Sequence, residues 1–215
     1  MMGDRDYGSV IKNAIDSIGK ELEIDIDVKD YNTIHLAEAV QCLRRSYYDR
    51  TDPKEVERRG FNDLISGLLR KLEYGSEPKL FEIDDLKLKG QADMIVDDII
   101  IIFRPIDVIP DAPQSSDLLY LNACMWIYDK TDGMILYITS DREEHTFSVT
   151  RDNKMFEQVV RRVRVLNDLL KDQKTPILEP SKNCIDCQYY QRCFISKKIS
   201  KHVSLAEMLG LSKEN

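Results

Sequence analysis

The chain has 215 residues, of which 42% are hydrophobic and 32% charged, and its formal net charge is −7. This balance predicts a folded globular protein, and it excludes a disordered chain and a surface that binds nucleic acid through overall positive charge. No apolar run approaches the roughly 18 residues of a membrane helix, and the N-terminus lacks the apolar segment of a signal peptide, so we expect a cytoplasmic protein.

The first part of the chain has the periodicity of helices. Apolar residues recur on one side of residues 8–22. A second helix is expected over residues 35–50, capped by Asn32 or Thr33 and ended by the turn at residues 51–53. A third amphipathic helix is expected over residues 54–74, followed by a break at residues 75–78.

From Leu80 onwards the pattern indicates strands. The segments LFEIDDLKLKG, GQADMIV and IIIIFRP, with a turn at Asp97 and Asp98, predict an antiparallel β-meander whose third strand is central. A helix is then expected over residues 117–130, strands over residues 134–140 and 145–151, and a long amphipathic helix over residues 153–172.

These elements predict an α/β protein, more specifically an α+β one, with three regions. Residues 1–78 form a helical region, residues 79–175 the core and its long helix, and residues 176–215 a cysteine-containing segment. Within the last region, residues 204–211 are expected to form a tail helix capped by Ser204. This helix either docks on its own domain or binds a partner protein.

Three of the five cysteines lie in the stretch CIDCQYYQRC, at Cys184, Cys187 and Cys193. In a reducing compartment such spacing is typical of metal ligands. A tetrahedral zinc or a four-iron four-sulfur cluster takes four ligands, and the candidates for the fourth are Cys42, Cys124, His35 and His202. Cys124 lies in an apolar helix and is expected to be a buried small hydrophobic residue. A zinc site completed by His202, or thiols that bind no metal, remain alternatives.

Cys42 is followed by the basic and aromatic segment LRRSYYDR, and the C-terminal cysteines come about 140 residues later. This arrangement resembles the CRISPR-associated, RecB-like iron–sulfur exonucleases of the PD-(D/E)xK superfamily, from about Tyr31 to about Lys198. The resemblance implies a restriction-endonuclease-like core, with a mixed sheet flanked by helices. It also implies a four-iron four-sulfur cluster that clamps the C-terminal segment to an N-terminal helix through Cys42, Cys184, Cys187 and Cys193.

In that family an Asp on one strand and a Glu-x-Lys on the next bind Mg²⁺ or Mn²⁺. By the resemblance, GQADMIV places Asp93 at the metal position, whereas IIIIFRP has Ile102 in place of the Glu and Arg104 in place of the Lys. Alternation puts Ile102 and Arg104 on one face of their strand. An arginine stays protonated and binds phosphate as a fork, so it is a weak replacement for a lysine that activates water.

Two helices around this site also depart from the family pattern. Asn122 and Trp126 stand where the family has a Gln and a Tyr, and the helix before the sheet lacks the family's His. Asp93 alone makes a poor magnesium site, so an Mg²⁺ or Mn²⁺ ion would need a second carboxylate, from Asp107 or Asp111 in the following loop.

We therefore expect a DNA-binding, nuclease-deficient subunit or scaffold of a CRISPR, replication or repair assembly, acting on single-stranded or end-containing DNA. Its DNA contacts are expected from Arg44, Arg45, Tyr48, Arg104, Lys197 and Lys198. The basic runs read equally as solvated helix faces, with the tyrosines packed around the cluster. The alternative functions are an active Mg²⁺- or Mn²⁺-dependent single-strand exonuclease and a zinc-stapled protein-interaction module.

Overall fold

The computed structural model of the chain describes residues 26–53, 68 and 74–194. The helices expected over residues 8–22 and 204–211 lie outside the described residues, as do nearly all of the helix expected over residues 54–74 and the residues Lys197, Lys198 and His202. Within the described ranges, no helix combines the length and the apolar character needed to cross a bilayer.

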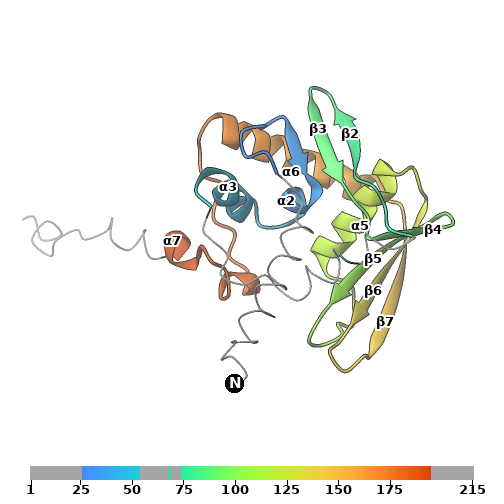
Figure 1. Ribbon diagram of the computed structural model, residues 1–215. Coiled ribbons are helices and arrows are strands. Elements are labelled where there is room, and N and C mark those ends of the chain that lie inside the picture. The colour runs from blue at the N-terminus through green and yellow to red at the C-terminus, as the bar shows by residue number, and fades with distance from the viewer. Residues whose placement is uncertain (1–25, 54–67, 69–73, 195–215) are drawn as a thin grey trace, which may run out of the picture.

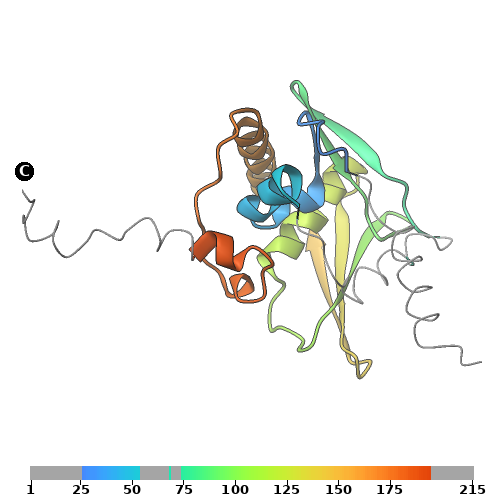
Figure 2. The same ribbon diagram turned by 60° about the vertical axis from the view of Figure 1, so that its left-hand side comes forward.

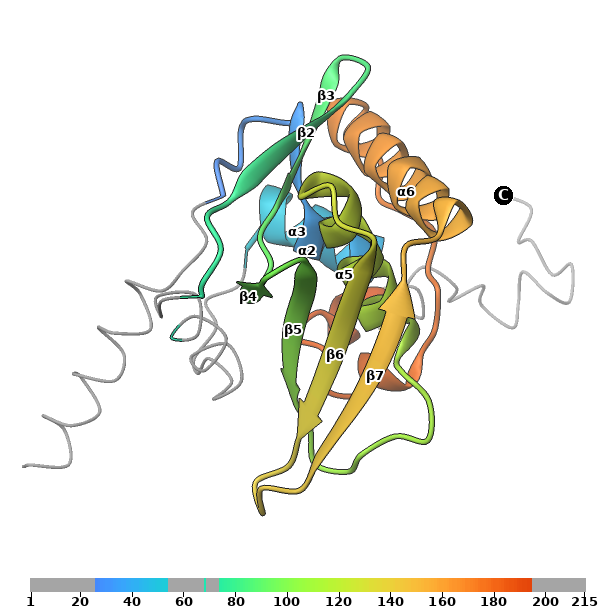
Figure 3. The same cartoon turned by 90° about the vertical axis from the view of Figure 1, so that its right-hand side faces the viewer.

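The described strands form two sheets that contain both parallel and antiparallel pairs. The smaller sheet has the order β1-β3-β2 and consists of β1 (Thr33–His35), β2 (Lys79–Ile83) and β3 (Leu86–Gly90). The larger sheet has the order β4-β5-β6-β7 and consists of β4 (Met94–Val96), β5 (Ile99–Pro105), β6 (Asp132–Ile138) and β7 (Glu144–Thr150). The β1-β3 and β5-β6 pairs are parallel. Figure 3 shows the larger sheet face-on with helices behind it, so the expected mixed α/β architecture is confirmed.

The expected continuous meander is wrong in one respect. The β2-β3 and β4-β5 hairpins form, but they belong to different sheets. Between the two hairpins, side chains rather than a neighbouring strand bind the backbone carbonyl groups. Tyr120 Oη donates to Gln91 O at 2.7 Å, and Ser76 Oγ donates to Ala92 O at 2.7 Å. The apolar strand β5 lies between β4 and β6, as expected for a central strand.

The two long helices form where periodicity predicts them. Helix α5 (Ser115–Ile127) joins β5 to β6 and packs on both strands, and helix α6 (Asn153–Lys171) packs on α5. Helix α5 can approach β6 closely because Gly133 lacks a side chain: a Cβ at this position would lie 2.7 Å from Leu121 Cδ1. Helix α6 begins at a capped end, where Asp152 accepts a hydrogen bond from Met155 N at 2.8 Å.

The single helix expected over residues 35–50 is instead a strand and two helices. After β1 come α2 (Leu36–Val40) and α3 (Leu43–Thr51), with a break at Gln41 and Cys42. His35 rather than Asn32 or Thr33 caps α2, and Glu38 Oε2 accepts from His35 N at 2.8 Å. Arg162 of α6 stabilises the break between the two helices, because its guanidinium donates to Ala39 O and Gln41 O, both at 2.5 Å. The end of α3 at Thr51 agrees with the expected turn.

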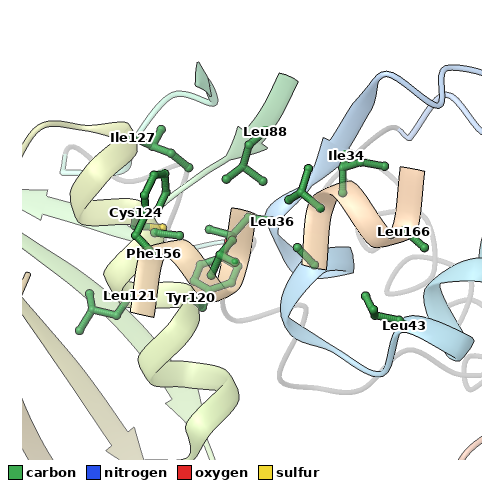
Figure 4. Packing of buried hydrophobic residues seen from close by; sticks show 14 of the residues in the cluster. Ile34, Leu36, Leu43, Leu88, Tyr120, Leu121, Cys124, Ile127, Phe156 and Leu166 are labelled. Carbon is green, nitrogen blue, oxygen red and sulfur yellow. The ribbon is translucent and has the colours of Figure 1, made fainter. Parts of the chain in front are cut away.

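One hydrophobic core joins residues from all three expected regions, including Ile34, Leu88 and Tyr189. Figure 4 shows part of it, where side chains of β1, α2, β3, α5 and α6 meet. The C-terminal segment, with a short 3-10 helix η1 (Lys182–Cys184) and helix α7 (Tyr190–Phe194), lies beside α3 in Figures 1 and 2. The division into three regions stays a prediction.

Candidate functional site

Asp93 and Arg104 meet between β4 and β5. Asp93 immediately precedes β4 and is fully buried. Its Oδ2 accepts from Phe103 N at 2.8 Å and from Arg104 Nη1 at 3.1 Å. The Asp93 carboxylate is thus compensated by a guanidinium from the neighbouring strand.

A second carboxylate, Asp117 in the first turn of α5, lies on the other side of the same guanidinium. Arg104 Nε donates to Asp117 Oδ1 at 2.9 Å, and Tyr137 of β6 donates its hydroxyl hydrogen to Asp117 Oδ2 at 2.7 Å. The Tyr137 hydroxyl also accepts from Gln114 N at 3.0 Å. Arg104 therefore bridges two carboxylates, and its Cζ lies 5.0 Å from the ring centre of Tyr120.

This arrangement shifts two pKa values. Burial disfavours the charge of Arg104, but Asp93 and Asp117 outweigh that effect and raise the pKa of its guanidinium. Burial, aided by the hydrogen bond to Asp117, raises the pKa of Tyr137 to about 12. Near neutral pH the site therefore holds one fixed cation and a neutral phenol, and neither group is suited to take a proton from water.

Ile102 lies on the helix-facing side of β5 and is fully buried, like Ile100. This agrees with the expectation that Ile102 and Arg104 share a face, since Arg104 reaches Asp117 of α5. Asp107 and Asp111, expected as sources of a second carboxylate, are exposed in the loop after β5. Asp117, which was not considered from the sequence, is the carboxylate that lies beside Arg104.

Asn122 is part of a different contact from the one expected. In the orientation that satisfies both of its polar atoms, its amide donates to Asp152 O at 2.9 Å and accepts from Asp152 N at 2.8 Å. Trp126, four residues later, stacks on Phe156 with ring centres 5.0 Å apart and lies under the Arg151 guanidinium. Both side chains therefore hold the start of α6 against α5, and the expected role of Asn122 in a catalytic site stays a prediction.

Asp117 and Tyr137 are the residues that sequence reasoning missed. Tyr137 of β6 reaches the site through the parallel register, which places it opposite Arg104 of β5. The strand pattern of β6 also carries a single polar group among its buried positions, Gly133, Ile135 and Tyr137. Asp117 gave a weaker signal, because an acidic residue in the first turn of a helix is common at any helix start.

The four expected metal ligands come from two places in the chain. Cys42 is exposed and immediately precedes α3. Cys184 ends η1, Cys187 follows in a turn in which its N donates to Cys184 O at 3.2 Å, and Cys193 is buried in α7. Cys124 is fully buried in α5, as expected, and His35 is buried at the start of α2. None of the five cysteines forms a disulfide.

The surroundings of Cys193 shift the pKa of its thiol. Burial raises the pKa of the Cys193 thiol, Arg44 lowers it in part, and the thiols of Cys187, Cys42 and Cys184 raise it further. Four thiols without a histidine form a donor set that fits an iron–sulfur cluster or a Cys₄ zinc site. In the described part of the chain, however, no three His, Cys, Asp or Glu side chains are arranged closely enough to hold a metal ion.

Of the expected DNA contacts within the described ranges, three are engaged inside the molecule. Arg104 bridges Asp93 and Asp117, and Tyr48 is only 3% exposed, so its ring offers no face to a base. Arg44 Nε donates to Tyr48 Oη at 3.2 Å. Arg45 is exposed, with an ion pair to Asp49 at 3.8 Å. Among the expected DNA contacts that the structure describes, it is the side chain most accessible to DNA.

Neither a model of a protein family nor a curated protein matches the chain. Among solved structures, the crystal structure of SSO0001 superposes with a TM-score of 0.61 at 17% identity, covering 86% of this chain and 96% of that one. The chain therefore shares the fold of SSO0001.

Two exonuclease structures are less similar. They are the alkaline exonuclease LHK-Exo from Laribacter hongkongensis (TM-score 0.42, 10% identity, 66% and 90% covered) and a phage-related exonuclease from Haemophilus somnus 129PT (0.42, 14%, 64% and 83%). These TM-scores are too low to support a conclusion about this chain.

Proposed function

We propose that this chain is a RecB-like, PD-(D/E)xK-type protein that has lost metal-dependent cleavage and binds DNA as a subunit or scaffold of a DNA-processing assembly. The observation that carries the loss of cleavage is the bridge from Arg104 to Asp93 and Asp117. A hard divalent cation needs several oxygen ligands, and here a guanidinium lies between the carboxylates while Ile102 supplies no oxygen. The protein thus contains its own cation where the nuclease would bind a metal.

The same geometry suggests how the alternative function, an active metal-dependent exonuclease, would bind its metal ion. Asp93 and Asp117 both face Arg104, so a metal ion that displaced the guanidinium would find two carboxylates. We favour the inactive protein because displacing Arg104 would move a charged side chain out of two ion pairs, and because Arg104 stays protonated at any physiological pH.

DNA binding rests on the resemblance and on the exposure of Arg45. The proposed cofactor is a four-iron four-sulfur cluster on Cys42, Cys184, Cys187 and Cys193, supported by the thiol-only donor set and by the contacts of Gln188 and Tyr189 with Asp49 of α3. When bound, such a group would cross-link the N-terminal part of the chain to the C-terminal part. Binding would require the thiols to close around it.

A cleavage and gel-shift assay on anaerobically purified protein tests this function. We expect no cleavage of end-labelled single- or double-stranded DNA with Mg²⁺ or Mn²⁺, and retarded migration of single-stranded DNA. Arg45→Ala should weaken binding and reduce the salt slope by about one, as loss of one phosphate contact does. Cleavage that disappears in Asp93→Ala would overturn the inactive site, and the absence of any shift would overturn DNA binding.

Metal content distinguishes the cluster from the zinc module. We expect a brown protein with iron and acid-labile sulfide, both lost when Cys187 is replaced by Ser, whereas Cys124→Ser should keep them. A colourless protein with one zinc per chain would instead support the zinc-stapled interaction module.

A further inference from the structure

One face of α3 contacts the C-terminal cysteine segment, Cys184–Phe194, and the linker before it. Arg44, Tyr48 and Asp52 recur at intervals of four residues and so lie on one side of the helix, with Asp49 next to them. Because α3 begins directly after Cys42, the helix that presents the N-terminal thiol also binds the segment that carries the other three.

Asp49 makes the central polar contacts. Its Oδ1 accepts from Gln188 Nε2 at 3.0 Å and from Tyr189 Oη at 2.9 Å, while its Oδ2 faces Gln41 Nε2 at 3.4 Å. Gln41 is the residue before Cys42, and Gln188 is the residue after Cys187. One carboxylate therefore links the immediate neighbours of two thiols that are far apart in the sequence.

Aromatic and charged contacts surround Asp49. Tyr189 is fully buried, with its ring centre 5.1 Å from that of Tyr48. The Arg192 guanidinium lies over the ring of Tyr48, with Cζ 4.0 Å from the ring centre, and it forms an ion pair with Asp52. Arg44 Nη1 reaches Pro176 O in the linker at 3.4 Å. None of these contacts uses a thiol.

We propose that Asp49 is a positioning residue that docks the segment Cys184–Phe194, which carries three of the thiols, on the helix that follows Cys42 before any metal or cluster binds. The identity of the bound group belongs to the function proposed above, whereas the docking needs no metal. Arg44 and Tyr48, which the sequence suggested as DNA contacts, act in this intramolecular interface.

Hydrogen exchange of metal-free protein tests the docking. In the full-length chain treated with chelator, amides of residues 188–193 should be protected, because the segment stays on α3. Asp49→Ala removes the acceptor that the Tyr189 hydroxyl and the Gln188 amide share, so exchange there should rise by about tenfold or more. Tyr189→Phe removes one of the two bonds and keeps the ring, and should give a smaller increase. Asp172→Ala, an exposed carboxylate paired with Lys174, is the matched control and should change nothing.

Cobalt binding supplies the second measurement. Co²⁺ added to metal-free wild-type protein should give thiolate charge-transfer absorption, and Asp49→Ala should bind Co²⁺ about tenfold more weakly while Asp172→Ala binds normally. A segment that is unprotected without metal and becomes protected only on loading would overturn the docking while leaving the cofactor intact. Protection that persists in a protein that binds neither iron nor cobalt would uphold the docking and overturn the cofactor.

Discussion

At the scale of single residues, the charge of Arg104 compensates two carboxylates. Two carboxylates converge on it from different elements, Asp93 before β4 and Asp117 in α5. A buried charge whose partner is removed is strongly unfavourable, so the site is expected to be sensitive to the loss of its cation.

Arg104→Ala is therefore predicted to destabilise the protein by about 3–5 kcal/mol, because Asp93 would remain buried without its cation. Urea denaturation measures this as a lower midpoint. Arg164→Ala is the control: its ion pair with Asp84 is exposed, and its loss should cost well under about 1 kcal/mol. Equal effects of the two substitutions would show that Arg104 is not compensating a buried charge.

Tyr137 gives the site a pH dependence. Its pKa of about 12 lies above the ordinary 10.0, so the folded state holds this proton more tightly than the unfolded state does. The resulting stability is present in full below pH about 10 and is lost as the pH rises from there towards about 12. The free energy of unfolding should fall more steeply over this window in the wild type than in Tyr137→Phe. Parallel pH curves for the two proteins would contradict the raised pKa.

Part of this site could be predicted from the sequence and part could not. Strand alternation and the G-x-x-D pattern gave Asp93, Ile102 and Arg104 their places, since those relations are local. Asp117 and Tyr137 reach the site through the packing of α5 and the parallel pairing of β6, neither of which local spacing determines. The contact of Asn122 with Asp152 was not predicted, because helical spacing does not tell which neighbouring element a buried side chain meets.

At the scale of elements, the break between α2 and α3 decides where Cys42 lies. The sequence reads as one helix there, because nothing in residues 35–50 is a strong helix breaker. Arg162 of α6 supplies the donors for the last carbonyls of α2, a contact from a distant part of the chain. By contrast α5, β6, β7 and α6 were predictable, because their periodicities are long and regular.

Arg162→Ala should consequently loosen this junction. Two carbonyl groups would lose charge-assisted hydrogen bonds, which predicts a loss of about 1–3 kcal/mol in stability. It should also raise hydrogen exchange around residues 40–44 ahead of that in β5. Arg161→Ala, an exposed neighbour on the same helix, should leave both quantities unchanged. Unaltered exchange in Arg162→Ala would mean that the break is held by other contacts.

A further internal ion pair, between Arg50 of α3 and Glu38 of α2, fixes the two short helices to each other. Arg50 donates to both carboxylate oxygens, at 2.6 and 2.7 Å, and also to the carbonyls of Asp27, Asp30 and Thr33. Both side chains are almost fully buried. Helices of five and nine residues are too short to be stable alone, so this pair and the core hold them in place.

We predict that Arg50→Ala costs about 3–5 kcal/mol, since it leaves Glu38 buried and unpaired, while replacing both residues by apolar ones of similar size costs much less. Thermal denaturation of Arg50→Ala, and of Arg50→Met combined with Glu38→Leu, checks this prediction. A double substitution that is as destabilising as Arg50→Ala would show that the carbonyl contacts of Arg50, rather than the charge pair, matter most.

At the scale of the whole molecule, early and late parts of the described chain contact each other at two places. The hydrophobic core includes residues of β1, β3 and α7, and the cysteine segment contacts α3 through Asp49. The molecule shares the fold of SSO0001 over most of both chains. At the position where the proposed nuclease relationship would put a metal ion, the guanidinium of Arg104 lies between the carboxylates of Asp93 and Asp117.

Titration calorimetry with Mn²⁺ tests whether Arg104 keeps a metal ion from the site of Asp93 and Asp117. The wild-type protein is used with its thiols blocked by alkylation. We expect no Mn²⁺ binding at the Asp93 site at concentrations up to about millimolar, because the guanidinium of Arg104 lies between the two carboxylates, and we expect new binding in the variant Ile102→Glu with Arg104→Lys. Mn²⁺ binding by the wild type that Asp93→Asn abolishes would contradict it, because Arg104 would then have yielded its place to the metal.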